Sequence, residues 1–478
     1  MALFKQSGDF NQASVNLANL KNNWLVMKKL AGNRPLMAVV KGDAYGHGLV
    51  ECARTLVAAG AKTLGVMDVR EGVTLRKAGV TAPDVYVMAG LDSDNLIQEA
   101  VNNNLSVFAY AFDQMASLGI QGGKSGARIK VFLKVDTGMN RLGIPWNLAL
   151  DFIKRSKDYA YLSVTGLLTH LATVGDDDAM RQLERFWSLC GRAEAILGKP
   201  LVNSALSGGA MLAHPDYPDG MSRPGLVLYG VAPVLERDRD GFLALKTFRA
   251  PPEGYYFPAA PPPFPVARAR TGGEIRGKTD GEPDGKTDGK TDGWTESGTF
   301  ARSGGRTQEP EPAALLRDEA ENREAVETAL ASLKPVMKVT SRIIQIKNVS
   351  KGQAVSYGRT FKVAKDMKLA VVPMGYVHGL SSARSGKAKV LVRGQKVQNV
   401  GRICMNLSVF DISHIPTVPI GEEVIILGSR KDGGDVIDPY MEEKGHRQNP
   451  YEVLCLFGRL NRRNHVDDVG GPSRDFLF

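Results

Sequence analysis

The sequence predicts an α/β fold in which an N-terminal (β/α)8 barrel is followed by a C-terminal β-rich domain. Over residues 11–230, short apolar runs alternate with amphipathic segments and make up eight strand–helix units. From residue 334 onward, short strand-like runs follow one another with glycines at the turns, and no long helix is expected before residues 449–460. Eight alternating units fit a closed barrel better than an open doubly wound sheet.

The expected barrel opens with an amphipathic helix over residues 11–30, where Leu17, Leu20, Trp24 and Met27 recur at helical spacing. The expected strands are 36–40, 63–66, 85–88, 106–110, 129–135, 162–168, 201–205 and 226–229. The expected helices between them include 68–78, 95–103, 146–154 and 178–197. Because the strands of such a barrel are parallel, the residues that follow them gather at one end, where barrel enzymes bind ligands.

The composition divides the chain into a barrel over residues 1–233, an insertion over 234–332 and a β-rich domain over 333–478. The insertion contains a proline-rich stretch and repeats of Gly-Lys-Thr-Asp-Gly, which cannot bury apolar surface. It is therefore expected to be disordered for most of its length, with one charged helix near 313–333. An alternative assigns residues 1–12 to the C-terminal domain as well.

The composition also excludes several functional classes. The chain has 478 residues, with 61 Lys and Arg against 51 Asp and Glu, and a net charge of +10. It contains no dense basic tract with interleaved aromatic residues, so a nucleic-acid partner is not expected. The four cysteines form neither a CxxC pair nor a zinc-ligand cluster, which favours free thiols in a reducing cytoplasm. A signal peptide, a membrane span and a metal site are not expected either.

The stretch from Val39 to Gly48 is the first candidate site. It delivers Lys41 at the end of a buried strand, and Gly42 and Gly46 allow the backbone to approach a ligand closely. A lysine in such a place costs free energy unless its pKa falls or it is covalently consumed. A Schiff base to an aldehyde cofactor would consume it. The competing interpretation is an exposed loop lysine.

The stretch from Lys134 to Gly143 is the second candidate site. A strand ends at Asp136, a glycine turn follows, and Arg141 projects from the loop. An arginine there suits bidentate binding of a carboxylate, but a salt bridge to Asp136 explains it equally well. His170 ends another strand, where a packed structural histidine is the commoner interpretation.

Two further stretches complete the candidates. Ser204 and the run from Arg223 to Leu226 lie at the last two strands, where small residues with free N–H groups form phosphate sites in barrels. In the second domain, Tyr357 lies between small residues in a turn. A structural tyrosine is the commoner interpretation, and an acid–base role needs nearby cations to lower its pKa from about 10.

Together these stretches resemble alanine racemase, a fold-type III family that depends on pyridoxal phosphate (PLP). The resemblance rests on residues 39–48, 134–143, 169–170, 355–361 and 401–405, of which the lysine motif is highly specific. It implies a PLP-bearing barrel, a β domain and a head-to-tail homodimer that shares its active sites. It also implies interconversion of L-alanine and D-alanine, with D-alanine supplied for peptidoglycan.

The resemblance assigns catalytic and substrate-binding roles. By it, Lys41 holds PLP and is one catalytic base, and Tyr357 from the partner subunit is the second base, on the opposite face of the cofactor. Arg141 and, from the partner subunit, the backbone N–H of Met405 hold the substrate carboxylate. Lys134 resembles a lysine that is often carbamylated and then fixes Arg141.

The remaining implied roles concern the cofactor and the entrance. The implied phosphate contacts are Tyr45, Ser204, Gly225, Leu226 and Tyr451. Arg223 resembles the arginine that contacts the pyridine nitrogen, and His170 resembles the residue beside the ring. Tyr376, together with Tyr451, is expected to narrow the entrance and favour a small side chain.

The chain departs from the family pattern at two positions near the expected entrance. His378 and Asn406 stand where the family usually has aspartates, which leaves the substrate range open. The alternatives are a serine or broader-specificity racemase and, less favoured, a fold-type III decarboxylase. Such decarboxylases place a cysteine and a glutamate where Tyr357 and Arg223 stand. A non-catalytic PLP-binding barrel would lack the β domain and its tyrosine.

Overall fold

The computed structural model describes residues 10–89, 91, 93–232, 235–237, 243–245, 319–430, 435–441 and 448–467. Its first element is a strand, β1 (Gln12–Asn16), which precedes helix α1 (Leu17–Ala31). The residues of β1 alternate between buried and half-buried, as in a strand with one covered face. The Asn16 side chain then accepts the Asn19 N–H at 2.9 Å and caps α1. The predicted helix is therefore wrong for the part before α1.

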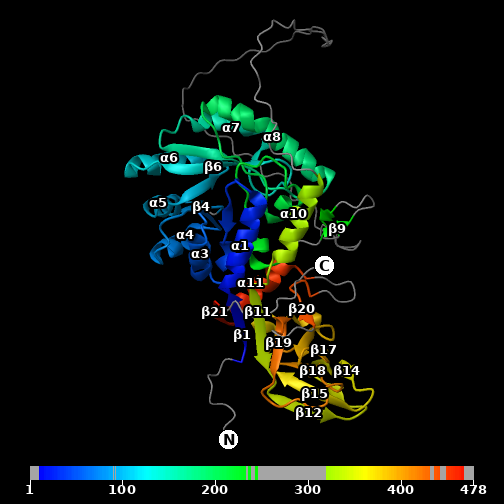
Figure 1. Cartoon of the computed structure of the whole chain (residues 1–478). Helices are drawn as coiled ribbons and strands as arrows, with labels where there is room; N and C mark the ends of the chain where they lie inside the picture. Colours follow the sequence, from blue (N-terminus) through cyan, green and yellow to red (C-terminus); the bar gives the residue numbers. More distant parts are fainter. Residues whose placement is uncertain are drawn as a thin grey trace, which may run out of the picture. The chain divides into compact units, whose positions relative to one another are not determined.

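The barrel strands follow one another in parallel order. They are β2 (Met37–Val39), β3 (Thr63–Val66), β4 (Asp84–Val87), β5 (Ser106–Ala109), β6 (Ile129–Asp136) and β8 (Leu162–Leu168). Two extended segments close the ring, because Ser204 bridges Leu168 of β8 and Ser222 bridges Leu36 beside β2. The Met37 N–H donates to the Ser222 carbonyl at 2.9 Å, so the first strand meets the last segment. The predicted barrel is present (Figure 1).

The last barrel segment lies earlier in the chain than expected. The predicted strand over 226–229 is instead a 3-10 helix, η2 (Leu226–Tyr229), and the segment around Ser222 completes the ring. Gly225 turns the backbone between them, with φ −122° and ψ −97°. All four residues of η2 are buried. A short apolar run does not distinguish a buried strand from a buried helical turn, which explains the error.

Aromatic and methionine side chains fill the interior of the barrel. This cluster consists of Met37, Tyr86, Phe108, Phe132, Leu168 and Met221. The centroid of the Phe132 ring lies 5.1 Å from that of Tyr86 and 5.9 Å from that of Phe108. A Cβ on Gly166 would fall 1.7 Å from the Val202 carbonyl oxygen, so glycine allows the chain to approach β8 here. The interior is a packed core, which leaves the barrel end for a site.

Helices cover the outside of the barrel. They are α3 (Leu49–Ala58), α4 (Val69–Lys77), α5 (Asp94–Asn102), α6 (Phe112–Ser125), α7 (Ala149–Ser156), α8 (Asp177–Leu197) and the short α9 (Gly208–Ala213). Asp68, Ser93 and Asp176 each accept a backbone N–H and cap the helix that follows. Helix α6 contains three glycines, Gly119, Gly122 and Gly123. A Cβ on Gly119 would fall 2.9 Å from the Tyr159 ring, so packing explains that glycine.

The C-terminal domain is built from short strands, as predicted. Its larger sheet runs in the order β17 (Gln395–Gln398), β16 (Lys389–Val392), β19 (Glu423–Ser429), β11 (Met337–Arg342), β1 and β21 (Arg462–Val466), with β20 (Val436–Ile437) beside β19. A second sheet holds β12 (Gln345–Val349), β15 (Met367–Val372) and β18 (Ser408–Asp411). Strand β13 (Ala354–Val355) pairs with β14 (Phe361–Lys362). Strand β1 therefore adds the start of the chain to a sheet made mostly by its end.

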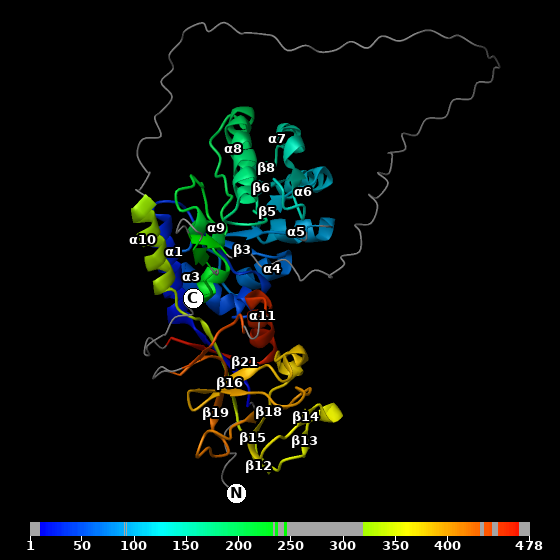
Figure 2. The same ribbon diagram turned by 90° about the vertical axis from the view of Figure 1, so that its right-hand side faces the viewer.

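Two helices link the second half of the chain to the barrel half. Helix α10 (Glu319–Ser332) lies beside α1 in both views (Figures 1 and 2). The Asn22 side chain of α1 donates to the Ser332 carbonyl at 2.8 Å. Part of the predicted insertion is thus an ordered helix, as expected near 313–333, and residues 246–318 lie outside the described residues. Helix α11 (Pro450–Leu460) contacts the turn after β2. Within the described ranges, no helix is long and apolar enough to cross a membrane.

Candidate active site

Lys41 lies just beyond β2, at the carboxyl end of a barrel strand. It is half-buried, and burial lowers the pKa of its amine. The nearby guanidinium groups of Arg141 and Arg223 lower this pKa further, while Glu71 acts in the opposite direction. The neutral fraction of the amine rises as a result. The neutral amine is the form that adds to a carbonyl group, so this lysine suits covalent chemistry.

The backbone after Lys41 forms a left-handed turn. Gly42, Asp43, Ala44 and Tyr45 have φ values of 67°, 58°, 53° and 53°. Each of the three non-glycine residues costs roughly 1–2 kcal/mol in this conformation. Such strain persists only where surrounding contacts over-determine it, and it concentrates at functional sites. Because the turn starts after Lys41 and ends on Tyr45, it sets how these two side chains project.

Two carboxylates tie this turn to the barrel helices. Glu71 of α4 accepts the Asp43 N–H at 2.9 Å through Oε1 and the Met67 N–H at 2.8 Å through Oε2. Asp43 in turn accepts the Leu49 N–H at 2.8 Å, at the start of α3. Both acids therefore hold backbone N–H groups in place, as charge-assisted acceptors do.

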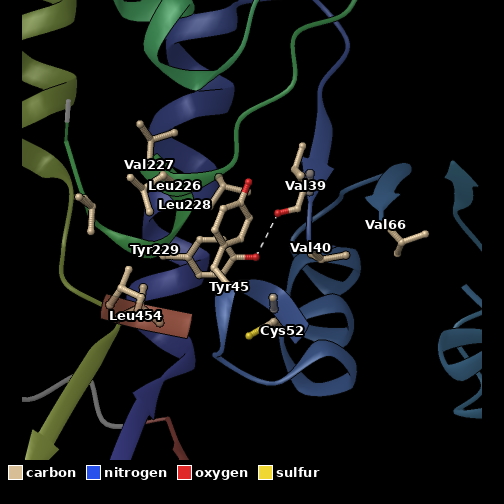
Figure 3. Packing of buried hydrophobic residues seen from close by; sticks show 14 of the residues in the cluster. Val39, Val40, Tyr45, Cys52, Val66, Leu226, Val227, Leu228, Tyr229 and Leu454 are labelled. Carbon is tan, nitrogen blue, oxygen red and sulfur yellow. Dashed lines mark hydrogen bonds between the residues drawn. The ribbon is translucent and has the colours of Figure 1, made fainter. Parts of the chain in front are cut away.

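His47 closes the turn from the other side. Its Nδ1 lies 2.9 Å from the Ala44 carbonyl oxygen and 3.1 Å from that of Tyr45, so Nδ1 carries the proton. Burial lowers the pKa of His47 to about 4, and the ring stays neutral. It stacks on Tyr229 at 4.5 Å, and the Tyr229 hydroxyl donates to the Val39 carbonyl at 3.1 Å (Figure 3). The turn is thereby anchored to both β2 and η2.

Tyr45 points toward the start of η2. Its ring lies 4.9 Å from that of Tyr229 and 5.8 Å from that of Tyr451 of α11. A Cβ on Gly225 would fall 2.5 Å from the Tyr45 hydroxyl oxygen, so only glycine leaves room there. Within the described part of the chain, the N–H groups of Gly225 and Leu226 donate to no backbone acceptor. A hydroxyl beside free N–H groups at the start of a helical turn suits a phosphate.

Arg223 lies buried in the last barrel segment. Its guanidinium donates to Ser204 Oγ and, at 2.6 Å, to the Thr169 carbonyl. Ser204 Oγ in turn donates to the Met221 carbonyl. The contacts of the Ser204 hydroxyl in this structure are thus with Arg223 and Met221, and not with Tyr45. Burial lowers the pKa of Arg223 to about 10, which still leaves a cation at neutral pH.

Asp219 is the buried counter-charge to Arg223, and no sequence pattern pointed to it. Its carboxylate accepts the Ala205 N–H at 2.7 Å, the Leu206 N–H at 3.2 Å and the Ser222 hydroxyl at 2.7 Å. Burial raises the pKa of Asp219, while Arg223 and these donors lower it. Asp219 therefore joins the two segments that close the barrel, next to Arg223.

Positive charge gathers around Lys41. Lys134, at the end of β6, is only 8% exposed, and burial with the charges of Arg223 and Arg141 lowers its pKa to about 8. His170 has its pKa lowered well below the usual value by burial and by the same two arginines. The histidine is therefore neutral. A site with this excess of cations favours anionic ligands.

Asp136 organises the loop that carries Arg141. Its carboxylate accepts the N–H groups of Gly138 at 2.9 Å, Asn140 at 3.0 Å and Arg141 at 3.2 Å. These are backbone contacts, and among the described residues the Arg141 guanidinium makes no ion pair with Asp136. Of the two interpretations from the sequence, the salt bridge is absent from this structure. The guanidinium is exposed and available to a carboxylate.

Tyr357 lies in a separate group in the C-terminal domain. It is 73% exposed and lines a pocket of about 810 Å³ with Tyr376, Arg402 and Met405. All lining residues of this pocket belong to the C-terminal domain. One chain therefore brings together Lys41 and the barrel residues, and it leaves Tyr357, Tyr376 and Met405 in a second group.

The residues around Tyr357 include a free N–H group that suits a ligand. They also explain the departure from the family pattern at His378. Among the described residues, the Met405 N–H has no backbone acceptor. Its neighbour Tyr376 belongs to η4 (Tyr376–His378), and His378 Nδ1 accepts the Gly375 N–H at 3.2 Å. Burial lowers the pKa of His378, so the ring is neutral and acts as a cap. Asn406 lines the same pocket as Tyr357.

The structure combines a closed α/β barrel with a β domain, and a desolvated lysine lies at the ligand end of the barrel. These features define a class of two-domain barrel enzymes with a lysine-centred site. Comparison with known families sharpens this class. The model of the alanine racemase N-terminal domain matches residues 15–233, and that of the C-terminal domain matches residues 336–465. The chain belongs to the alanine racemase family, whose members depend on PLP, and it is an isomerase of the amino-acid racemase type.

Individual relatives agree with this assignment. The chain is 27% identical to an alanine racemase of Clostridium perfringens over 462 residues, which covers 95% of each chain. The structure of the alanine racemase from D-cycloserine producing Streptomyces lavendulae matches with a TM-score of 0.72 and 22% identity, covering 97% of this chain and 99% of that one. That of Bartonella henselae, with covalently bound pyridoxal phosphate, matches at 0.66 and 18%, covering 96% and 100%. The fold class predicted from the sequence is confirmed.

Proposed function

We propose that this chain interconverts L-alanine and D-alanine with PLP bound at Lys41. The observation that carries the proposal is the desolvated Lys41 amine beside the Tyr45–Gly225 cradle, in a chain of the alanine racemase family. A lysine with a lowered pKa and an anion cradle a few residues away match an aldehyde cofactor that bears a phosphate.

The barrel residues fit PLP. The Tyr45 hydroxyl and the N–H groups of Gly225 and Leu226 would hold the phosphate, and Tyr451 lies against Tyr45. Ser204 would join them through its hydroxyl, which here contacts the Met221 carbonyl and Arg223. When bound, PLP supplies an electron-poor ring that takes up the electron pair left at the substrate α-carbon.

Arg223 and His170 would tune that ring. An arginine facing the pyridine nitrogen stays protonated at neutral pH, even with a pKa of about 10, and so keeps the nitrogen unprotonated. His170 is neutral and lies among the same charges. Such surroundings weaken the electron sink and limit side reactions. A cofactor ring of this kind suits racemisation, in which one proton leaves the α-carbon and one returns.

Racemisation needs a proton acceptor and a proton donor on opposite faces of the α-carbon. The Lys41 amine, with its lowered pKa, would exchange the proton on one face. Tyr357 would serve the other face from a second copy of the chain, since it lies exposed in the C-terminal domain. The exposed side chains of Tyr376 and Met405 beside it support a surface that a partner covers. The proposed assembly is a homodimer with shared sites.

The substrate carboxylate would lie between Arg141 and the Met405 N–H. The guanidinium is exposed, and Asp136 holds its loop. Lys134, with a pKa of about 8, has a substantial neutral fraction that can add to carbon dioxide, releasing one proton and leaving a carbamate. The negative carbamate would then pair with Arg141 and fix it.

The biological role and the substrate range stay predictions. D-alanine for peptidoglycan is the role that the family suggests, and a cytoplasmic location rests on the cysteine usage. Tyr376 and Tyr451 favour a small substrate, whereas Asn406 and His378 remove acidic groups near the expected entrance. A racemase for serine or for several amino acids is therefore the main alternative within the same class.

A coupled D-amino-acid oxidase assay over a panel of L-amino acids tests the proposal. We expect D-alanine from L-alanine at the highest rate, with deuterium from the solvent at the α-carbon. Comparable turnover of serine would favour the broader racemase. Release of an amine and carbon dioxide without D-alanine would contradict racemisation and indicate a decarboxylase.

A further inference from the structure

The left-handed turn after Lys41 is held by the last strand of the described chain. Arg463 of β21 donates through Nη1 to Asp43 Oδ2 and, at 3.2 Å, to the Gly46 carbonyl oxygen. Two residues later, His465 Nε2 lies 2.8 Å from the His47 carbonyl oxygen. These contacts join residues more than 400 positions apart in the sequence. Because β21 pairs with β1 in the C-terminal sheet, the turn is tied to that sheet.

Helix α11 leaves no room for the turn to relax. A Cβ on Gly46 would fall 2.6 Å from the Leu454 carbonyl oxygen, and a Cβ on Gly458 would fall 1.9 Å from the Gly46 carbonyl oxygen. Backbone therefore packs directly against backbone at this contact. The end of the turn is fixed by shape, and its start is fixed by the acids that bind its N–H groups.

Arg463 supplies hydrogen-bond donors that the other contacts of the turn do not provide. Asp43 Oδ1 is taken by the Leu49 N–H, so its Oδ2 depends on Arg463. The two side chains are 29% and 27% exposed, which places the pair at the edge of the interior. Removing the guanidinium would leave a carboxylate oxygen and the Gly46 carbonyl without this donor, in a turn that is already strained.

We propose that Arg463 is a positioning residue for Lys41 and Tyr45, which acts by locking the left-handed turn through Asp43 and Gly46. The role rests on the proposed function of Lys41 as the cofactor lysine. The C-terminal segment then contributes to the site of its own chain by fixing the cofactor lysine. This contribution is separate from that of Tyr357.

The test compares Arg463→Gln and Arg463→Lys with Arg393→Gln as a matched control. Arg393 pairs with Glu422 at 3.0 Å in the C-terminal domain and makes no contact with the turn. The first readout is hydrogen exchange of the peptide that spans Gly42 to Leu49 in the cofactor-free protein. The second is the dissociation constant for PLP, followed by the absorbance of the lysine-bound cofactor.

We expect exchange in this peptide to accelerate by about tenfold in Arg463→Gln and PLP affinity to fall by about as much, since a charged hydrogen bond is lost. Arg463→Lys keeps the charge and should recover part of both effects. The control should match the unsubstituted protein. In the double variant Arg463→Gln with Asp43→Asn, exchange should accelerate by less than the two single effects combined, because both changes break the Arg463–Asp43 pair.

Unchanged exchange and unchanged PLP affinity in Arg463→Gln would overturn the proposal. If that variant fails to fold, Arg463→Lys decides: exchange in the turn faster than in the unsubstituted protein supports the proposal, and equal exchange overturns it. Failure of the proposed function looks different. In that case the unsubstituted protein shows no lysine-bound absorbance that depends on Lys41, while the exchange results still report on the turn.

Discussion

The turn after Lys41 and the loop around Tyr357 both contain residues with positive φ, but different contacts support them. Gly42 to Tyr45 have positive φ, and so do Ser356, Gly358 and Arg359 on either side of Tyr357. The lysine turn is enclosed by carboxylates, a neutral histidine and the last strand. The tyrosine loop lies on an open pocket, where Ser356 Oγ donates to the Arg402 carbonyl at 2.7 Å.

This difference indicates where each half of the site is completed. The chain itself supplies the contacts that over-determine the lysine turn, so Lys41 is positioned within one copy. The tyrosine loop holds its shape but presents a side chain that is 73% exposed. A catalytic tyrosine needs a surrounding that excludes water and provides nearby charges. In our proposal, the barrel mouth of a second copy provides that surrounding.

Replacing Lys41 should have the largest effect. We expect Lys41→Ala to lower the racemisation rate by about 10⁴-fold or more, because both the covalent attachment and one proton carrier are lost. The absorbance of the lysine-bound cofactor should disappear as well. Lys130→Ala serves as the control, since Lys130 lies on the same barrel in an exposed salt bridge with Asp84. Retention of the absorbance in Lys41→Ala would contradict the assignment.

Replacing Tyr357 should have the next largest effect, and a one-sided one. We expect Tyr357→Phe to slow turnover by about 10²–10³-fold through loss of one proton carrier. Exchange of the α-proton with solvent should slow from one enantiomer much more than from the other. Tyr161→Phe, an exposed tyrosine on the barrel, provides the control. Equal slowing from both enantiomers would remove the assigned role of Tyr357.

The pH dependence of stability tests the desolvation on the barrel side. Lys134 has a pKa of about 8 in the fold against 10.5 for an ordinary lysine, so the unfolded chain binds more protons between these values. Stability should therefore rise with pH across pH 8 to 10.5, by up to about 3 kcal/mol from this group. In Lys134→Met, measured by denaturant unfolding without cofactor, this part of the rise should vanish. The same dependence of stability on pH in both proteins would contradict the lowered pKa of Lys134.

The contacts that hold the lysine turn and the tyrosine loop should differ in how much they contribute to the free energy of unfolding. Glu71→Gln removes one of two charge-assisted acceptors and should cost about 1–3 kcal/mol, together with weaker PLP binding. Ser356→Ala removes the hydrogen bond to the Arg402 carbonyl and a weak contact with Cys404 Sγ, and should cost about 1 kcal/mol without changing the absorbance of the lysine-bound cofactor. Both values follow from denaturant unfolding. A larger loss from Ser356→Ala than from Glu71→Gln would reverse the comparison.

Local patterns in the sequence predicted the barrel and much of the site. Strands followed by helices, and a lysine at a strand end, leave a periodic signal that a single sequence carries. The η2 turn was missed because its four buried residues resemble a strand. A short buried run of this kind could not be resolved without knowing its neighbours in the fold.

The contacts of single buried or half-buried charged residues left no such signal. Asp219 binds backbone of the closing segments, and Arg463 meets Asp43 across 420 positions. Each is one charged residue among many in the sequence, and only the fold shows its partner. The same holds for Arg141, where the sequence left a salt bridge to Asp136 open and the structure shows backbone contacts instead.

Mixing two inactive chains tests the shared site most directly. Lys41→Ala and Tyr357→Phe chains, co-expressed and purified together, would form mixed dimers in which one site has neither substitution and the other has both. Random pairing then predicts recovery of about one quarter of the activity of the unsubstituted protein. Activity no higher than the average of the two parents, in a preparation shown to contain mixed dimers, would contradict a site shared between two copies.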